Sequence, residues 1–201
     1  MEQNQIGMKI NLLSGTVIDL ENIDLSKLTI NDIALGLCRE PRYVGQTRKG
    51  PLTVGQHILL GLGLFKTECI HNRDFKKYID YGLEFHLHDA PEMISGDVPT
   101  QVKRWIGQAW YDKENILHQK FNERFNLKSD ENTLRIIKHY DLMALAFELK
   151  YFTYNCEKRD DLPQIKYDMP DIFKTIMDEK ECYDLFIKEF YELENARKII
   201  V

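Results

Sequence analysis

The chain has 201 residues, of which 43% are hydrophobic and 29% charged, a balance typical of a globular protein with one sizeable core. Lys and Arg number 27 against 32 Asp and Glu, giving a formal net charge of -5. This net charge argues against a protein that binds duplex nucleic acid, because such binding needs an excess of Lys and Arg. No signal peptide and no apolar run long enough to span a bilayer is evident, so we expect no membrane partner and a cytoplasmic location.

The first segment of the chain is predicted to be extended. Residues 9–20 form two short apolar stretches around Ser14-Gly15, which predicts a β-hairpin. Helical signals follow it. Helices are expected over residues 30–37, over residues 53–69 with Thr53 as the N-cap, and over residues 78–89.

Pro91, Gly96 and Pro99 then predict a loop. Further along, amphipathic patterns predict helices over residues 105–125 and 134–152. A polar loop over 157–169 and two short helices over 170–177 and 180–198 complete the chain. The fold class we expect is all-α, with residues 1–201 as a single domain and a short N-terminal β-hairpin in front.

Four cysteines are scattered along the sequence, and no two of them form a CxxC pair. This spacing disfavours a thiolate zinc site and a disulfide scaffold, and indicates reduced, buried thiols. The four are Cys38, Cys69, Cys156 and Cys182.

Four side chains of metal-ligand type stand on the predicted helices: His57, His88, Asp89 and Asp141. Two imidazoles and two carboxylates suit a borderline divalent metal. A carboxylate such as Asp141 in an apolar helix is costly unless it is paired or bound to a cation. A lone histidine on an apolar helix is more often a hydrogen-bonded core residue, so this pattern by itself leaves the function open.

The surrounding motifs are more specific. Residues 88–103, HDAPEMISGDVPTQVK, resemble the HD-superfamily signature HDxxExxxGDxPxxxK, found in bacterial 5'-deoxynucleotidases and in phage phosphohydrolases that include dATP triphosphohydrolases. Residues 53–57, TVGQH, are similar to the SVAxH segment of that family. Residues 41–47, PRYVGQT, are similar to the RxxGxT element of the phage branch, and residues 141–148 resemble its DxxxLxxE helix. The resemblance covers about residues 13–152.

This resemblance implies an HD-domain helical bundle that holds one divalent metal cation (Mn, Co, Zn, Fe or Mg) through His57, His88, Asp89 and Asp141. HD proteins with two metals add two more histidines between the HD pair and the last Asp. Only His118 and His139 occur in that interval here, and His139 is two residues from Asp141, so a single metal is favoured.

Roles are also expected for five further residues, and the resemblance implies those of Glu92, Arg42 and Lys103. Glu92 would be the catalytic acid/base, and Asp97 a second catalytic carboxylate, although a turn or capping Asp is an equal alternative. Arg42 and Lys103 match phosphate-binding positions of the phage branch. Tyr43 would bind substrate by stacking on a base, or would be a core residue.

Three other side chains have open roles. Glu148 lies one heptad after Asp141 and would hold a metal ligand or a buried Arg. His86 is either a support for the metal site or a core residue, and His118 is expected on the surface.

The expected function is metal-dependent hydrolysis of phosphate from (deoxy)nucleotides in a bacterial or phage-infected cell, by a homo-oligomer. Whether the enzyme would be a 5'-deoxynucleotidase or a dNTP triphosphohydrolase stays open, as does the base. The alternatives are a phosphodiesterase acting on a cyclic or oligonucleotide signal and a non-catalytic nucleotide-binding HD module. A sensor would not need a general acid/base such as Glu92.

Overall fold

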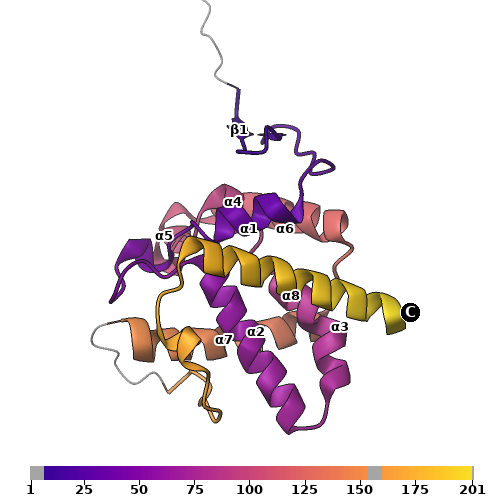
Figure 1. Cartoon of the computed structure of the whole chain (residues 1–201). Coiled ribbons are helices and arrows are strands. Elements are labelled where there is room, and N and C mark those ends of the chain that lie inside the picture. The colour runs from indigo at the N-terminus through magenta and orange to yellow at the C-terminus, as the bar shows by residue number, and fades with distance from the viewer. Residues whose placement is uncertain (1–6, 154–159, 201) are drawn as a thin grey trace, which may run out of the picture.

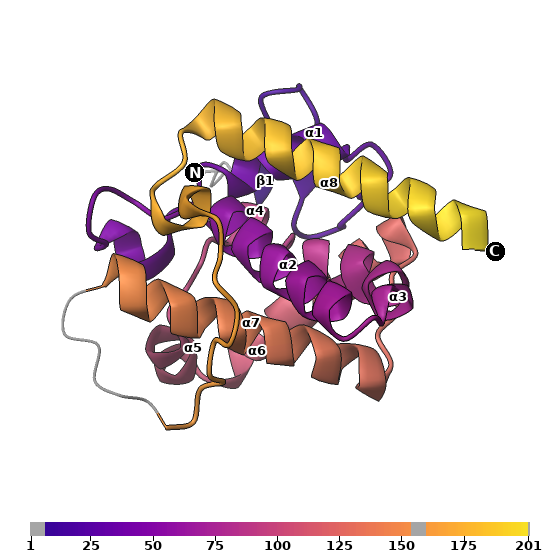
Figure 2. The same cartoon turned by 60° about the horizontal axis from the view of Figure 1, so that its bottom comes forward.

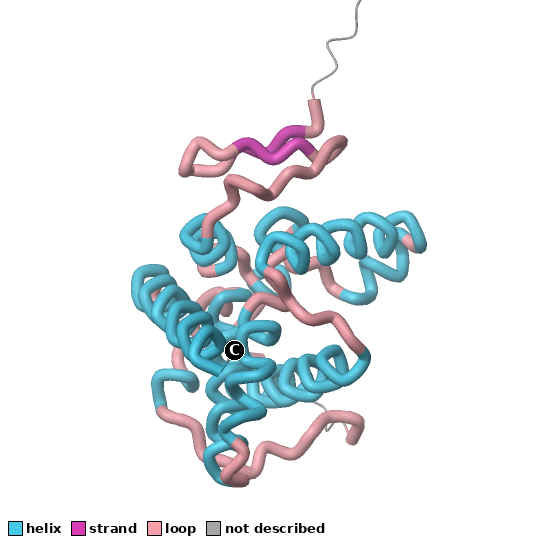
Figure 3. Tube along the Cα trace, turned by 90° about the vertical axis from the view of Figure 1, so that its right-hand side faces the viewer, coloured by secondary structure: helices cyan, strands magenta, loops and turns pink. Residues whose placement is uncertain are grey.

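A computed structural model of the chain describes residues 7–153 and 160–200, with the side chain of Ile200 left undescribed (Figure 1). It opens with strands β1 (Lys9–Asn11) and β2 (Val17–Asp19), which pair antiparallel. Gly15 adopts a φ of 87° in the turn between them, a conformation that costs glycine little. Figures 1 and 3 place this hairpin at one end of the molecule, beyond α1. The predicted N-terminal β-hairpin is confirmed.

Helices make up most of the described chain, so the all-α class is confirmed as well. Two 3-10 turns, η1 (Arg42–Gly45) and η2 (Asp171–Lys174), lie among them. The α-helices are α1 (Ile30–Leu37), α2 (Val54–His71), α3 (Phe75–His86), α4 (Glu92–Ser95), α5 (Thr100–Ile106), α6 (Gln108–Phe125), α7 (Glu131–Phe152) and α8 (Glu179–Ile200). No helix within the described ranges is both long enough and apolar enough to cross a membrane.

Helix α2 is the centre of the structure. It packs against α3, α7 and α8, and Figure 2 shows it running between α8 and α7 with α3 beside it. Its sequence is apolar on nearly every face, as a helix surrounded by protein requires. Thr53 accepts a hydrogen bond from Gln56 N at its start, which confirms the predicted N-cap. Gly61 lets α3 approach closely, since a Cβ there would lie 2.4 Å from Phe85 Cζ.

Two predicted helix boundaries are wrong in ways that affect the site. The helix predicted over 78–89 is α3, which ends at His86, so His88 and Asp89 lie in the turn that follows it. The helix predicted over 105–125 is divided into α5 and α6 at Gly107, which adopts a φ of 84° that interrupts a right-handed helix. The amphipathic pattern continues across this break, which is why periodicity alone missed it.

Two smaller predictions also need correction. The loop predicted around Gly96 contains the single turn α4, and the helix predicted over 170–177 is only the 3-10 turn η2. Short segments bury little and their periodicity is a weak signal. Residues 160–169 form the predicted loop, while its first residues and Cys156 lie outside the described part of the chain.

Candidate metal centre

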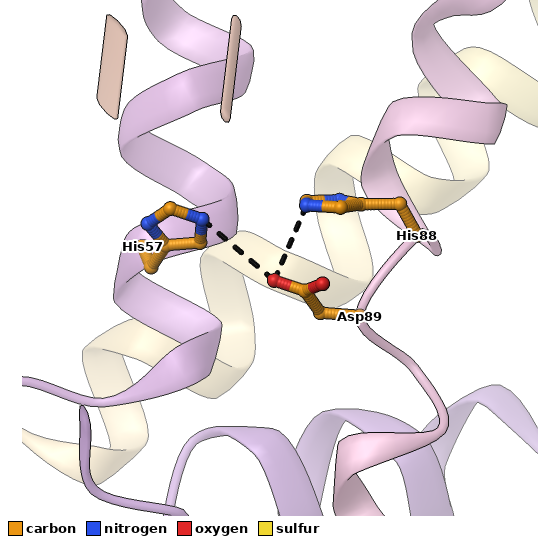
Figure 4. A group of neighbouring side chains, drawn as sticks. All are labelled: His57, His88 and Asp89. Atoms are coloured by element: carbon orange, nitrogen blue, oxygen red, sulfur yellow. Dashed lines mark ion pairs between the residues drawn. The ribbon is translucent and has the colours of Figure 1, made fainter. Parts of the chain in front are cut away.

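Three of the predicted ligands converge from two elements of the fold. His57 stands on the first turn of α2, whereas His88 and Asp89 belong to the turn between α3 and α4. Figure 4 shows both imidazoles pointing at the Asp89 carboxylate. Asp89 Oδ2 lies 3.2 Å from His88 Nε2 and 3.7 Å from His57 Nε2. The ligand atoms of all three lie within 4.8 Å of one another, so this group could hold a metal ion.

The protonation of the two rings follows from their other contacts. His88 Nδ1 lies 2.6 Å from the Phe85 carbonyl oxygen, and His57 Nδ1 lies 2.6 Å from Glu148 Oε1. A carbonyl or a carboxylate only accepts, so each Nδ1 donates a hydrogen bond, and each Nε2 is left to face the carboxylates of the group. Among the described residues, neither Nε2 has a hydrogen-bond partner, although both are buried. Two buried ring nitrogens that converge on one carboxylate fit a cation, which would take the place of any proton on Nε2.

Asp141, the fourth predicted ligand, borders this group from α7. Its Oδ1 lies 3.3 Å from His57 Nε2, and its Oδ2 accepts a hydrogen bond of 2.7 Å from Lys138 Nζ. Burial alone would raise the pKa of Asp141, but the contact with His57 outweighs it and holds that pKa below its usual value. The structure therefore brings all four predicted ligands to one place.

Glu148 supports the group from behind His57. It is fully buried on α7, and besides His57 it accepts hydrogen bonds from Arg42 Nε at 3.2 Å and from the Tyr43 hydroxyl at 2.8 Å. Burial would raise the pKa of Glu148, but the positive charge of Arg42 and the bond from His57 outweigh it and lower that pKa. Both roles considered for Glu148 are thus present: it contacts the predicted ligand His57 and it pairs with the buried Arg42.

The segment that carries Arg42 is held in an uncommon conformation. Tyr43 and Val44 adopt φ values of 55° and 53°, in the left-handed region that β-branched residues rarely enter. Three hydrogen bonds fix the segment: those of Arg42 Nε and the Tyr43 hydroxyl to Glu148, and one of 2.8 Å from Arg42 N to Leu52 O. Arg42 Nη1 also lies 3.9 Å from Asp97 Oδ2. The predicted phosphate ligand Arg42 is therefore paired with carboxylates of the chain itself.

The two predicted catalytic carboxyls flank the group. Glu92 begins α4, and within the described ranges its buried Oε2 has no hydrogen-bond partner. Burial, together with the charges of Asp89 and Asp97, raises the pKa of Glu92 to about 9 when only the protein groups are considered. Asp97 is positioned through its backbone, whose N–H donates to Glu40 Oε1 at 3.1 Å, and burial raises its pKa too.

Lys103, the second predicted phosphate ligand, lies on α5 and is held by α6. Its ammonium group forms an ion pair with Glu114 and lies 6.0 Å from the centre of the Trp110 ring. Burial would lower the pKa of Lys103, but the bond to Glu114 outweighs it and raises that pKa. Lys103 is therefore charged and already paired.

A cavity of about 710 Å³ opens beside the metal-ligand group. Its lining includes His88 and Asp89 together with polar residues on one face of α6: Asn115, His118, Gln119 and Asn122. His118 is half-buried there, and burial lowers its pKa, so the prediction of a surface histidine is wrong. The spacing of this polar stripe, at i, i+3, i+4 and i+7, is the signal in the sequence that could have identified the cavity wall.

Comparisons with other proteins relate the chain to a bacterial protein. No family model matches the chain. An uncharacterized protein of Rhodobacter capsulatus is 34% identical over 147 residues, which cover 71% of this chain and 67% of that protein.

Proposed function

The chain belongs to the same family as this Rhodobacter capsulatus protein, and we propose that it is a metal-dependent phosphohydrolase of the HD type that removes phosphate from a nucleotide. The observation that carries the proposal is the convergence of the buried Nε2 atoms of His57 and His88 on the Asp89 carboxylate. A purely structural helical bundle gains nothing from gathering two imidazoles around a carboxylate in its interior.

The residues fit one divalent cation. His57, His88 and Asp89 would hold it, with Asp141 beside His57. Two imidazoles with carboxylates suit manganese, cobalt, zinc or iron. Magnesium is the alternative, although it is a hard cation that prefers oxygen ligands. When bound, the cation would supply Lewis-acid chemistry for attack of water at phosphorus.

Glu92 would handle the proton. Without a cation, the pKa of about 9 means that Glu92 keeps its proton at neutral pH. A cation beside Asp89 would lower that pKa by neutralising one of the charges that raise it, which would let Glu92 accept the proton of the attacking water. The negative charge of Asp97 would act in the opposite direction and raise the pKa of Glu92.

The cavity of about 710 Å³ would take the rest of the substrate, since its volume suits a nucleotide. The α6 face with His118 and Asn115 offers donors and acceptors to a base or sugar. Arg42 and Lys103 would contact phosphate from beside their carboxylate partners. Because both cations are already partly neutralised, the arrangement favours a nucleoside monophosphate over a longer phosphate chain.

A panel assay tests the proposal. The protein is incubated with Mn²⁺ or Co²⁺ and with deoxynucleoside mono- and triphosphates, and the products are identified. Inorganic phosphate with nucleoside is expected, whereas tripolyphosphate with nucleoside would establish the triphosphohydrolase. Release of no phosphate from any member of the panel would contradict the proposed function.

The variant Glu92→Gln isolates the proton step. It preserves the shape of the side chain and removes its titration, so Mn²⁺ should still bind while turnover falls by about 10²- to 10⁴-fold. Glu131→Gln, at an exposed carboxylate on α7, is the matched control and should keep full turnover. Unchanged turnover in Glu92→Gln would exclude Glu92 from the chemical step.

A further inference from the structure

Two cysteines that lie far apart in the sequence meet in the core. Cys38 caps the C-terminal end of α1, and Cys182 lies in the first turn of α8. Their sulfur atoms are 2.9 Å apart, and the side chains are 3% and 1% exposed. The sulfur separation is within about 1 Å of the length of a disulfide bond. The proposed hydrolysis assigns neither thiol a role.

The surrounding residues hold the two thiols together. Gly55 provides the space, because a Cβ there would lie 2.7 Å from Cys38 Sγ and 3.0 Å from Cys182 Sγ. The Thr53 hydroxyl lies 3.8 Å from Cys182 Sγ. Next to the thiols, Arg39 on the α1 side forms an ion pair of 2.6 Å with Glu179 on the α8 side. The ends of α1, α2 and α8 are thus fixed around the sulfur atoms.

We propose that Cys38 and Cys182 form a reversible intrachain disulfide when a hydroperoxide is present, and that this bond links α1 to α8. The inference is independent of the proposed hydrolysis. It also changes the interpretation of the cysteines, which the sequence indicated to be reduced, buried thiols. Burial restricts the reaction to small, uncharged oxidants, of which hydrogen peroxide is the natural probe.

The chemistry balances with hydrogen peroxide as the oxidant. Cys182 is the attacking group, because the hydrogen bond that the Cys38 thiol donates to it lowers the pKa of Cys182. Its thiolate attacks one peroxide oxygen, so an S–O bond forms, the O–O bond breaks, and hydroxide leaves and takes up the proton that Cys182 had released. The Cys38 sulfur then attacks the sulfenic sulfur, so the S–S bond forms and the S–O bond breaks. Water leaves with the Cys38 proton, and two electrons have passed from the thiols to the peroxide.

The bond would close a very long loop. Residues 38–182 include α2, α3, α7 and every residue of the candidate metal centre. Closing a long loop restricts the unfolded chain more than the folded one. We therefore expect the oxidised protein to unfold at a temperature about 5–15 °C higher than the reduced protein.

Mass spectrometry of the whole chain tests the inference. The reduced protein is treated with hydrogen peroxide, its remaining thiols are alkylated, and it is digested. A linked peptide pair containing Cys38 and Cys182 is expected, together with the higher Tm, and dithiothreitol should reverse both. Cys38→Ser and Cys182→Ser should lose the link and the Tm shift, whereas Cys69→Ser, at another buried thiol, should keep them.

The inference can be tested on the unaltered protein alone, so the test does not depend on whether a cysteine variant folds. Alkylation of both Cys38 and Cys182 after peroxide treatment would overturn it. So would a disulfide that joins either one to Cys69 or to Cys156, or their oxidation to sulfinic acid without a link. A Cys38–Cys182 link that leaves the Tm unchanged would contradict the expected stabilisation by loop closure.

Discussion

Two fully buried histidines, His57 on α2 and His86 on α3, have opposite surroundings. His57 lies among charged groups: burial and Arg42 would lower its pKa, but Glu148 and Asp141 outweigh them and raise it to about 10. His86 lies among aromatic rings, with Phe186 at 4.0 Å between ring centres, and its Nε2 lies 3.0 Å from the Phe186 carbonyl oxygen. Burial lowers its pKa to about 3. Burial alone therefore does not mark a metal ligand.

An unpartnered nitrogen does not mark a ligand either. In the described part of the chain, His86 Nδ1 is buried without a hydrogen-bond partner, as are His57 Nε2 and His88 Nε2. The difference is convergence: the two Nε2 atoms face the same Asp89 oxygen from different elements, at 3.7 and 3.2 Å. His86 has a carbonyl and aromatic rings beside it instead. We infer a ligand set from the shared carboxylate and not from either histidine alone.

The largest expected difference between the two histidines is in metal binding. His57→Gln removes a ring nitrogen that would bind the cation, so the affinity for Mn²⁺ should fall by at least about 100-fold, and hydrolysis with it. His86→Gln keeps an N–H that can donate to the Phe186 carbonyl and should bind Mn²⁺ as the unaltered protein does. Isothermal titration with Mn²⁺ measures both affinities. Equal affinities in the two variants would remove His57 from the ligand set.

A smaller loss of Mn²⁺ affinity is expected when Glu148, which lies behind the predicted ligand His57, is changed. Glu148→Gln keeps an oxygen near His57 but removes the charge that fixes the ring and pairs with Arg42, so the affinity for Mn²⁺ should fall by about 10- to 100-fold. Glu84→Gln is the matched control, because Glu84 is another buried carboxylate and is paired with Arg197 at 3.1 Å. Both variants should lose stability. If Glu84→Gln weakens Mn²⁺ binding as much, the effect at Glu148 reflects general loosening of the fold and not support of His57.

The smallest expected effect is the contribution of His86 to the pH dependence of stability. Its pKa is about 3 in the folded protein against an ordinary value of 6.5, so between these values the unfolded chain binds a proton that the folded chain does not. The free energy of unfolding should therefore decrease as the pH falls below 6.5, by at most about 1.4 kcal/mol per pH unit. From pH 7 to pH 5 the contribution of His86 is about 2 kcal/mol.

Urea unfolding at pH 7 and at pH 5 measures this contribution. The unaltered protein should lose more stability between the two values than His86→Gln, which cannot take up the proton. The same loss in both proteins would show that the acid sensitivity comes from other groups, and that His86 is not the uncharged counterpart of His57.

Local sequence determined the type of most elements. The two short apolar stretches around Ser14-Gly15 predicted the hairpin, Thr53 predicted the start of α2, and the apolar pattern predicted α1 within its observed bounds. These features depend on residues a few positions apart, so the chain carries them before any tertiary contact forms. The residue types of His57, His88, Asp89 and Asp141 likewise pointed to a metal, and the structure brings these four together.

Tertiary structure decided which side chains meet. Glu148 contacts His57 across 91 residues and Arg42 across 106, and Cys38 meets Cys182 across 144. No periodicity encodes such a pairing, because it depends on how α7 and α8 pack around α2. The same packing gives His57 its carboxylates and His86 its aromatic rings. The sequence alone therefore identified candidate ligands, whereas only the packing distinguished a histidine poised for a metal from a histidine of the core, because an ionisable group takes its chemistry from the neighbours that folding brings to it.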